Sequence, residues 1–491
     1  MKLQIKLNGE SYRDTVKACW LGKNIGGTFG APYEGSRKTW DVKGFATAPG
    51  EPVPNDDLDL QLIWLHAVES HGPRAVCAAM LGEHWLSLIP PNWNEYGVGK
   101  GNMKRGLTPP ISGDYENSWK NSNGAWIRTE IWACLSPGCP EFAAKYAMED
   151  AKVDHGAGEG TVAAAFVAAM QSAAFVIKDI RKCIEIALCA IPESTRMADS
   201  IRFVLECFDK GMTYMEARNA IFKRNSDIGD SWFEAPSNVS YAIIGLLWGK
   251  GDFKNSVIYA CNCGDDTDCT CATVGSTMGI LYGMAGIPED WMAYIGDEII
   301  TLSVNKGDAD AGALVPKTCT ELTERVCKQA PHALFANGAS TVIGDFEDEL
   351  PAESAEFLRE KCVKLCNETV FVPFSAHYEN ECLIADVVLS CAPDIAPEEE
   401  IEVTVYVRAH TSLGDDVINL TCRWWLPEGY NIESGRRTAV LTHKNSHDSG
   451  IATLKYKIKA GDAVGAVNRC VLEIVPESRF SVLYIPVVLL G

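Results

Sequence analysis

The sequence predicts two architectures in one chain of 491 residues, an all-α helical region followed by an immunoglobulin-like β-sandwich. Apolar residues recur at helical spacing from Tyr12 to about Cys366, whereas from Thr369 onward they alternate with polar residues at every second position. Turn residues separate the later segments at regular intervals, which is typical of short antiparallel strands. We therefore expect two domains, residues 1–360 and residues 369–491.

The composition is that of a soluble globular protein, with 22% charged and 47% hydrophobic residues. The net charge of −21 argues against a nucleic acid as partner, because nucleic-acid binders carry clustered Lys and Arg. No segment approaches the roughly 20 apolar residues of a membrane span. Residues 1–9 lack the apolar core of a signal peptide, so a reducing cytoplasm fits the odd number of 19 cysteines.

The helical region is expected to begin with a short strand over residues 1–9 and a helix from Tyr12. This helix leads into the glycine-rich segment 26–35, where glycines suit close helix packing and then a turn. Residues 90–125 are rich in Pro, Asn, Gly and Trp, and we expect a long irregular loop that covers a site. Further helices are expected over residues 58–68, 125–134, 142–150, 160–179, 239–248 and 253–261.

Two acidic clusters stand at predicted helix starts, one over residues 55–59 and one over residues 264–268. Neighbouring carboxylates repel, and each raises the pKa of the others unless a cation compensates. Carboxylate oxygens are the ligands that Mg²⁺ and Ca²⁺ prefer. Acidic residues also act as simple helix caps, which is the alternative interpretation. Two such helix ends facing each other would supply at least four hard oxygen ligands, so the duplication favours a metal site.

The helix after the second cluster carries Gly275, Gly279 and Gly283 at a spacing of four, which predicts a bare face open to close approach by another backbone. Beyond the helical region, the alternating pattern predicts about seven strands and a sandwich of the immunoglobulin-like class. The expected strands are residues 370–372, 383–389, 401–407, 417–425, 452–458, 468–474 and 480–488.

Four segments, taken in order, resemble the ADP-ribosylglycohydrolase family over roughly residues 11–300. The resemblance implies a compact all-α bundle with a binuclear Mg²⁺ site. The segments are Gly-Gly-Thr-Phe-Gly-Ala-Pro-Tyr-Glu at 26–34, Asn-Asp-Asp at 55–57, Asn-Gly-Ala-Trp-Ile-Arg at 123–128 and Gly-Asp-Asp-Thr-Asp-Cys at 264–269.

The resemblance also implies roles for individual residues. Glu34 would lie near the scissile bond, and Glu34 and Asp57 are the catalytic candidates. Asn123 and Gly124 would hold the pyrophosphate through backbone amides, while His155 and Gly156 would help to hold ADP-ribose. The implied metal ligands are Asn55, Asp56, Asp57, Asp266, Asp268 and Cys269.

Two implied ligands depart from the family pattern, which places Thr or Ser at the position of Asn55 and Thr at that of Cys269. An amide oxygen still suits Mg²⁺, whereas a thiol is a soft ligand that suits it poorly. The expected cofactor is therefore Mg²⁺, as one or two ions.

The expected function is Mg²⁺-dependent hydrolysis at ribose C1 of an ADP-ribosylated protein or small molecule, with release of ADP-ribose. One alternative is a protein of the same fold that binds ADP-ribose or a nucleotide without cleaving it. Another is a binding protein, or a homo-oligomer, that acts through its β-sandwich.

Overall fold

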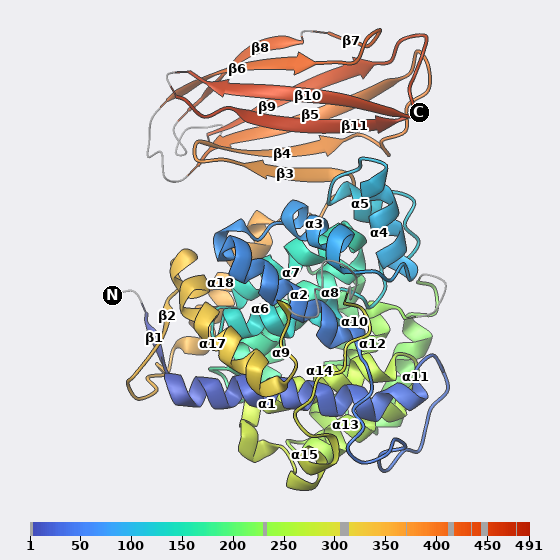
Figure 1. Cartoon of the computed structure of the whole chain (residues 1–491), viewed down its shortest axis with the longest axis vertical. Helices are drawn as coiled ribbons and strands as arrows, with labels where there is room; N and C mark the ends of the chain where they lie inside the picture. The colour runs from blue at the N-terminus through green and yellow to red at the C-terminus, as the bar shows by residue number, and fades with distance from the viewer. Residues whose placement is uncertain are drawn as a thin grey trace. The chain divides into compact units, whose positions relative to one another are not determined.

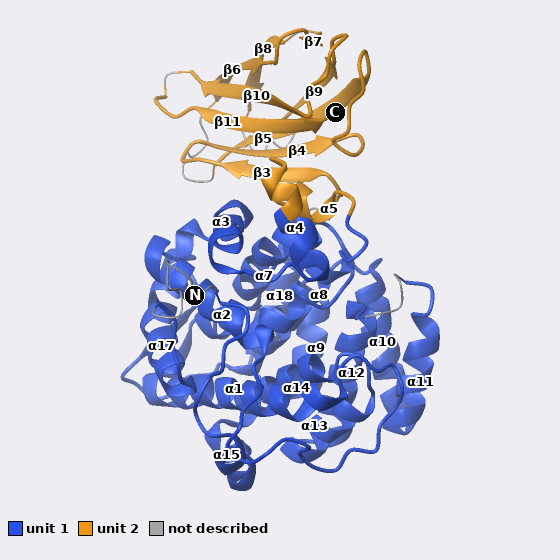
Figure 2. Cartoon of the chain, turned by 45° about the vertical axis from the view of Figure 1, so that its right-hand side comes forward, with its two compact units in different colours: residues 1–100, 117–370 blue, residues 101–116, 371–491 orange. Residues whose placement is uncertain are grey.

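The computed structural model describes residues 3–228, 233–304, 314–369, 371–410, 417–433, 435–442, 450–477 and 479–491. The chain forms two compact units, coloured separately in Figure 2. The helical unit comprises residues 1–100 and 117–370, and the sheet unit comprises residues 101–116 and 371–491. The predicted domain division, 1–360 and 369–491, stays a prediction.

The helical unit is built almost entirely of helices, as the apolar spacing predicts (Figure 1). Among the described residues, no helix is both long and apolar enough to cross a membrane. The elements are β1 (Ile5–Asn8), α1 (Gly9–Gly30), η1 (Ala31–Tyr33), α2 (Asp56–His71), η2 (Pro73–Ala75), α3 (Ala78–Leu88), α4 (Asn94–Lys104, whose last residues belong to the sheet unit), η3 (Trp126–Arg128), α6 (Glu130–Leu135), α7 (Pro140–His155), α8 (Glu159–Ala174), α9 (Ile180–Leu188), α10 (Arg196–Asp209), α11 (Tyr214–Arg224), α12 (Ala235–Gly249), α13 (Phe253–Asn262), α14 (Thr267–Tyr282), η4 (Met284–Gly286), α15 (Glu289–Ile295), α17 (Cys319–Ala336), β2 (Thr341–Gly344) and α18 (Ser354–Glu368).

Helices α1 and α14 pack against each other at unusually short distance. Gly22, Gly26 and Gly30 recur every fourth residue of α1, and a Cβ atom on any of them would lie 2.1–2.2 Å from a carbonyl oxygen of α14. A Cβ atom on Gly275 or Gly279 would overlap the α1 backbone equally closely. Only glycine permits this approach, which brings the C-terminal end of α1 beside the N-terminal end of α14.

Several expectations for the helical unit are met and others are not. The N-terminal strand is present as β1, which pairs in parallel with β2. The bare face of α14 is confirmed for Gly275 and Gly279, but Gly283 lies beyond the helix, which it ends with a φ of 65°. The segment 90–125 is less irregular than expected, because it contains α4 and the short helix α5 (Ile111–Asp114). The glycines of α4 led to the prediction of a loop. At Gly97 glycine is needed for packing, because a Cβ atom there would overlap the Asn92 carbonyl.

The sheet unit consists of two antiparallel sheets around one apolar core. The sheet orders are β11-β10-β6-β8 and β3-β4-β5-β9-β7. Inward side chains alternate along the strands, and the rings of Trp424 in β6 and Tyr456 in β9 meet edge to face at 5.4 Å. The strands are β3 (Ser375–Glu379), β4 (Leu383–Leu389), β5 (Glu400–Ala409), β6 (Ile418–Trp425), β7 (Asn431–Ile432), β8 (Arg436–Leu441), β9 (Ile451–Lys459), β10 (Val467–Pro476) and β11 (Leu483–Leu490).

Residues 101–116 complete the core of the sheet unit. Leu107, Ile111 and Tyr115 are buried in the apolar core formed by the strands. The Tyr115 hydroxyl also donates a hydrogen bond of 2.5 Å to Asp394. Removal of residues 371–491 would therefore expose apolar side chains of the segment that stays behind.

Six of the seven predicted strands are confirmed, as β4, β5, β6, β9, β10 and β11. The remaining prediction is wrong for residues 371–372, because the first strand of the unit begins at Ser375; residue 370 lies outside the described residues. The sequence pattern also missed β3, β7 and β8. The immunoglobulin-like strand arrangement stays a prediction.

We expect Gly26→Ala to lower the free energy of unfolding by about 1–3 kcal/mol, because its methyl group would overlap the Cys271 carbonyl. The helix propensity of alanine opposes this effect, so a loss identifies the steric overlap. Denaturation followed by circular dichroism measures it. Gly44→Ala is the matched control, since an added methyl there meets no atom within 4 Å. Equal stability of the two variants would contradict the close packing of α1 and α14.

Candidate active site

The two acidic clusters of the sequence lie together in the structure. Asp57 stands in the first turn of α2, and Asp268 and Cys269 stand in the first turn of α14. Glu34 follows α1 and η1, at the end of α1 that lies beside the start of α14. The two acidic helix starts therefore face each other, as expected. The glycine contacts between α1 and α14 position the Glu34 carboxylate beside them.

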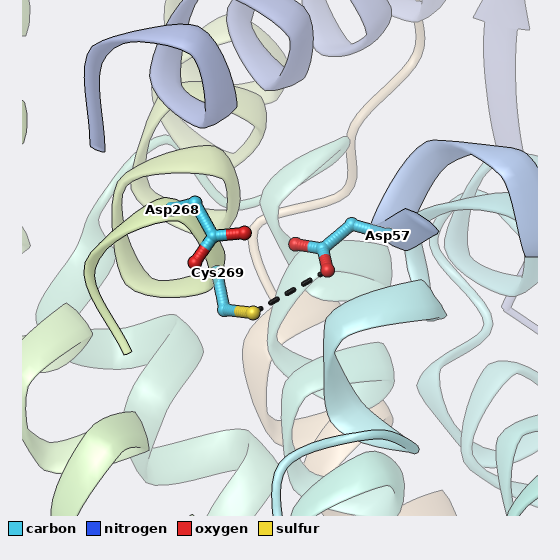
Figure 3. A group of neighbouring side chains, drawn as sticks. All are labelled: Asp57, Asp268 and Cys269. Carbon is cyan, nitrogen blue, oxygen red and sulfur yellow. Dashed lines mark hydrogen bonds between the residues drawn. The ribbon is translucent and has the colours of Figure 1, made fainter. Parts of the chain in front are cut away.

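The first potential metal-binding group consists of Asp57, Asp268 and Cys269, whose ligand atoms all lie within 4.8 Å of one another (Figure 3). The three residues are buried. In the absence of a metal, the Cys269 thiol donates a hydrogen bond of 3.4 Å to Oδ1 of Asp57. This group therefore combines two hard carboxylates with one soft sulfur atom.

The second potential metal-binding group consists of Glu34, Asp266 and Asp268, again with ligand atoms within 4.8 Å of one another. Asp268 thus belongs to both groups. Asp266 precedes α14, and its Oδ2 accepts a hydrogen bond of 2.6 Å from the Asn123 side chain. Every ligand in this second group is a carboxylate oxygen, as Mg²⁺ prefers.

The residues present suit a divalent cation. Oδ1 of Asp268 is buried and has no hydrogen-bond partner, although a buried carboxylate oxygen without a partner is costly. Oδ2 of Asp57 is likewise buried without a hydrogen bond. A cation beside Asp268 would satisfy its Oδ1 and offset the charges that the fold brings together, whereas Oδ2 of Asp57 already lies 3.6 Å from the Lys23 ammonium group.

Burial and neighbouring charges raise the pKa of four carboxyl groups of the site, those of Glu34, Asp56, Asp57 and Asp266. The charge of Asp268, together with burial and Asp56, raises the pKa of Glu34 to about 8. Burial and Asp268 raise the pKa of Asp56 to about 6. Burial is also the first cause of the strongly raised pKa of Asp57 and Asp266, with Asp268 adding to both. Carboxyl groups whose pKa is raised in this way cluster at functional sites.

A cavity of about 480 Å³ opens directly onto the second metal-binding group. Residues 93–96 and 122–124, from the segment expected to cover a site, line this cavity. The remaining lining comes from the three acidic segments and from apolar side chains. The lining includes Ala31, Glu34, Val53, Pro54, Asp56, Trp93, Asn94, Glu95, Tyr96, Ser122, Asn123, Gly124, Ile127, Phe233, Asp266, Asp268, Cys269 and Leu302.

Besides Asn123 and Gly124, four predicted site residues lie outside both metal-binding groups. Oδ1 of Asn55 caps α2 by accepting a hydrogen bond of 2.8 Å from the Asp57 amide, which is the ordinary role of a helix cap. Asp56 faces the cavity and accepts a hydrogen bond of 3.1 Å from the Tyr96 hydroxyl. His155 is fully buried and contacts the cavity-lining Ser122 at 3.3 Å. Gly156 ends α7 with a φ of 51°. Their predicted roles stay predictions.

The sequence reasoning missed a buried arginine that supports the cavity wall. Arg128 lies within hydrogen-bond distance of Asp150, at 3.0 Å, and of Asp154, at 2.9 Å. It also donates to the Gly124 carbonyl. Asp154 in turn contacts His155 at 2.8 Å, so these charges fix the loop that carries Asn123 and Gly124. The arginine at the end of the Asn-Gly segment was the available signal.

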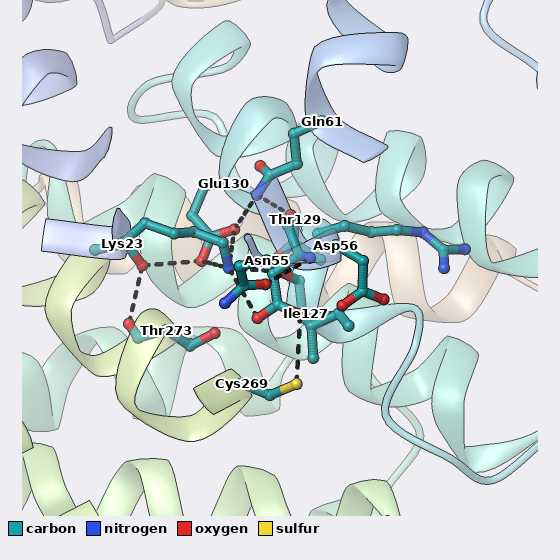
Figure 4. Close-up of polar contacts among 12 residues, drawn as sticks. Lys23, Asn55, Asp56, Gln61, Ile127, Thr129, Glu130, Cys269 and Thr273 are labelled. Carbon is teal, nitrogen blue, oxygen red and sulfur yellow. Dashed lines mark hydrogen bonds and ion pairs between the residues drawn. The ribbon is translucent and has the colours of Figure 1, made fainter. Parts of the chain in front are cut away.

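The sequence reasoning also missed a second buried cation, Lys23 of α1, which lies beside Asp57 and Glu130 (Figure 4). Burial lowers the pKa of Lys23, but the charges of Glu130 and Asp57 outweigh this effect and raise it. Nothing in the sequence distinguishes this lysine from the exposed lysines of an amphipathic helix.

Comparison with known proteins identifies the family. Residues 8–324 match the family model described as ADP-ribosylglycohydrolase. The chain therefore belongs to the ADP-ribosylglycohydrolase family, and its helical region has the corresponding fold.

Individual relatives match over shorter stretches. The chain is 35% identical over 51 residues to the ADP-ribosylarginine hydrolase Tri1 of Pseudomonas putida (strain GB-1), which is 10% of this chain and 14% of that protein. The protein of the same description from Serratia proteamaculans (strain 568) is 37% identical over 51 residues, with the same coverage. A solved structure described as an ADP-ribosylglycohydrolase-related protein complex is 21% identical, with a TM-score of 0.43, over 66% of this chain and 98% of that chain.

The raised pKa of Glu34 gives the metal-free protein a defined pH dependence. The folded state binds this proton more tightly than the unfolded chain, in which a glutamate titrates near about 4.3. Protonated Glu34 therefore contributes fully to the free energy of unfolding below the unfolded pKa, and this contribution is lost as the pH rises through about 8.

We expect Asp268→Asn to raise the melting temperature of the metal-free protein at pH 8, because it removes the largest cause of that shift. With added Mg²⁺ the wild type should have the higher melting temperature, since it keeps both metal-binding groups intact. Thermal melts from pH 5 to pH 8 in a chelator and in Mg²⁺ test this. A variant that is less stable than the wild type in the chelator at pH 8 would contradict the electrostatic interpretation.

Proposed function

We propose that the chain is a Mg²⁺-dependent hydrolase that cleaves the ribose C1 glycosidic bond of ADP-ribosylated substrates and releases ADP-ribose. The observation that carries the proposal is the convergence of Glu34, Asp266 and Asp268 at the mouth of one cavity. Membership of the ADP-ribosylglycohydrolase family supports it.

The carboxylates of the cavity suit the charge that develops in such a reaction. Cleavage at C1 passes through an oxocarbenium-like transition state, so negative charge beside the ribose favours it. Asp56, Asp266 and Asp268 supply that charge at the cavity wall. A divalent cation, when bound by these carboxylates, would polarise the oxygen atoms that contact it.

Glu34 is the group suited to transfer the proton. It is more exposed than the aspartates and lines the cavity, so it is accessible to a substrate. Its raised pKa keeps a proton available near neutral pH, as general acid–base catalysis requires. Asp57, the other catalytic candidate, is buried beneath the Cys269 thiol and is better placed to orient its neighbours.

The pyrophosphate of ADP-ribose would lie against Asn123 and Gly124. The Asn123 side chain is occupied by Asp266 and Trp126, which fixes the backbone of this turn. A Cβ atom at Gly124 would lie 2.0 Å from Oε1 of Glu95, so the Glu95 side chain would have to shift to admit a larger residue. Backbone amides in such a turn are suited to phosphate oxygens.

Arginine is the first acceptor group to test. The two curated relatives are described as ADP-ribosylarginine hydrolases, although the match covers 14% of their length. Arginine-linked ADP-ribose is therefore the first substrate to assay, followed by serine-linked and ester-linked forms.

We expect Glu34→Gln to lower the rate of ADP-ribose release by about 10²–10⁴-fold, because it removes the proton-transfer group. Binding of free ADP-ribose measured without a divalent cation should change little, since the amide keeps the shape of the side chain. Release measured by chromatography from an ADP-ribosylated arginine peptide tests this. Glu51→Gln is the matched control, an exposed glutamate outside the cavity lining.

A second candidate is a protein that binds ADP-ribose without cleaving it, which the thiol in the first metal-binding group favours. Calorimetry with ADP-ribose distinguishes the two candidates. Binding in Mg²⁺ without turnover of the arginine-, serine- or ester-linked substrates would overturn the hydrolase proposal in favour of the binding protein.

The cellular setting belongs to the same proposal. All 19 cysteines are free thiols, which supports a reducing cytoplasm. We also retain the proposal that the sheet unit serves binding or homo-oligomerisation, because two-sheet folds of this type provide interaction surfaces.

A further inference from the structure

Lys23 is a buried lysine beneath the candidate active site, with an exposed fraction of 1%. It donates hydrogen bonds of 2.5 Å to the Ile127 carbonyl and 3.1 Å to Oε1 of Glu130 (Figure 4). A buried ammonium group is expensive unless it is paired, so this position is built around a fixed positive charge.

Glu130 holds that charge in place. Gln61 donates to its Oε2 at 2.8 Å, while Ser276 and Gln171 donate to its Oε1 at 2.9 Å and 3.2 Å. Gln61 also accepts a hydrogen bond from the Ile131 amide at 2.8 Å. Glu130 therefore has little freedom to move, and the ammonium group of Lys23 is confined beside it.

The confined ammonium group faces the first metal-binding group. Its Nζ lies 3.6 Å from Oδ2 of Asp57, while Oδ1 of Asp57 receives the Cys269 thiol. Both carboxylate oxygens of Asp57 thus face groups supplied by the chain itself, and one of these groups is a cation.

The second metal-binding group is different. Among the described residues, no lysine or arginine forms an ion pair with Glu34, Asp266 or Asp268. Oδ1 of Asp268 has no hydrogen-bond partner. The described part of the chain therefore supplies no positive charge in direct contact with this group.

We propose that Lys23 serves as the chain's own cation at Asp57, and that the chain therefore binds a single divalent metal ion, held by Glu34, Asp266 and Asp268. The inference rests on the metal dependence included in the proposed function. The sequence predicts one or two metal ions, and the proposal narrows this number to one. That ion is assigned to the second metal-binding group.

The physical reason is competition for one carboxylate. A second divalent ion at Asp57 would lie within a few ångströms of a buried ammonium group, where like charges repel strongly because water does not screen them. The rival explanation is that the remaining ligands of such an ion would include the Cys269 thiol, which binds Mg²⁺ and Mn²⁺ poorly. The two explanations, Lys23 and Cys269, predict different outcomes for different variants.

The first experiment counts Mn²⁺ ions bound by the full chain, using the electron paramagnetic resonance signal of free Mn²⁺ and calorimetry. We expect one ion for the wild type. Two ions of similar affinity would overturn the proposal, and so would none. The count needs no substrate, so it is independent of whether the chain releases ADP-ribose.

The second experiment identifies the cause. Lys23→Met keeps the length of the side chain, removes its charge and should allow a second ion at Asp57. Cys269→Thr should leave the count at one, because Lys23 is still present; a count of two would assign the exclusion to the thiol and overturn the role of Lys23. Lys178→Met is the control, since this lysine lies outside the candidate site and, within the described residues, its hydrogen bonds go to the carbonyls of Ala174 and Ile280.

Lys23→Met leaves Glu130 as an uncompensated buried charge, which can prevent folding. The double variant Lys23→Met/Glu130→Gln removes both charges and keeps the hydrogen-bonding shape of Glu130. It should bind two Mn²⁺ ions. A folded double variant, with an unchanged circular dichroism spectrum, that still binds one ion would overturn the proposal.

Discussion

The close approach of α1 and α14 is the constraint on which the candidate site depends. Glycines at every fourth position of α1 let the two backbones touch, so that the end of one helix lies at the start of the other. Glu34 and Asp268 come together for this reason, although 233 positions of sequence separate them. A single methyl group in this contact would push the two helices apart and move Glu34 away from Asp268.

This geometry brings several carboxyl groups into a small, largely buried volume, which a stable metal-free fold would avoid. The pKa of Glu34 and that of Asp56 are raised for this reason, because burial and neighbouring negative charge favour the protonated form of each group. Natural proteins tolerate such strain where function requires it, and the rest of the fold must supply the stability. The strain is therefore itself evidence that a positively charged ligand belongs in the site.

The motifs could be predicted from sequence because their chemistry is concentrated in short segments. Residues 55–57 and 264–269 each combine a helix start with more carboxylates than a cap needs. The period of the apolar residues likewise placed most helices and six strands. The resemblance supplied what periodicity cannot, namely that the segments of Glu34 and Asn123 belong to the same site.

Other features depend on tertiary contacts that leave no local signal. Helix α4 escaped prediction because its glycines favour a loop, although packing makes them necessary. Strand β8 is mostly exposed and has too little apolar alternation to be recognised. Lys23 is indistinguishable from a solvated lysine until its neighbours are known. Sequence patterns thus locate the acidic residues of the candidate site. The residues that position them, such as Lys23, can be identified only from the three-dimensional structure.

The two buried cations of the helical unit show how these supporting groups act. Arg128 lies beneath the loop of Asn123 and Gly124, and Lys23 lies beneath Asp57. Each is paired with two carboxylates, and such buried pairs contribute little net stability compared with apolar packing. Their value is positional, because a charge confined by several hydrogen bonds fixes whatever contacts it. Within the described residues, neither cation forms an ion pair with Glu34, Asp266 or Asp268, so these three carboxylates of the cavity lining keep an unbalanced negative charge.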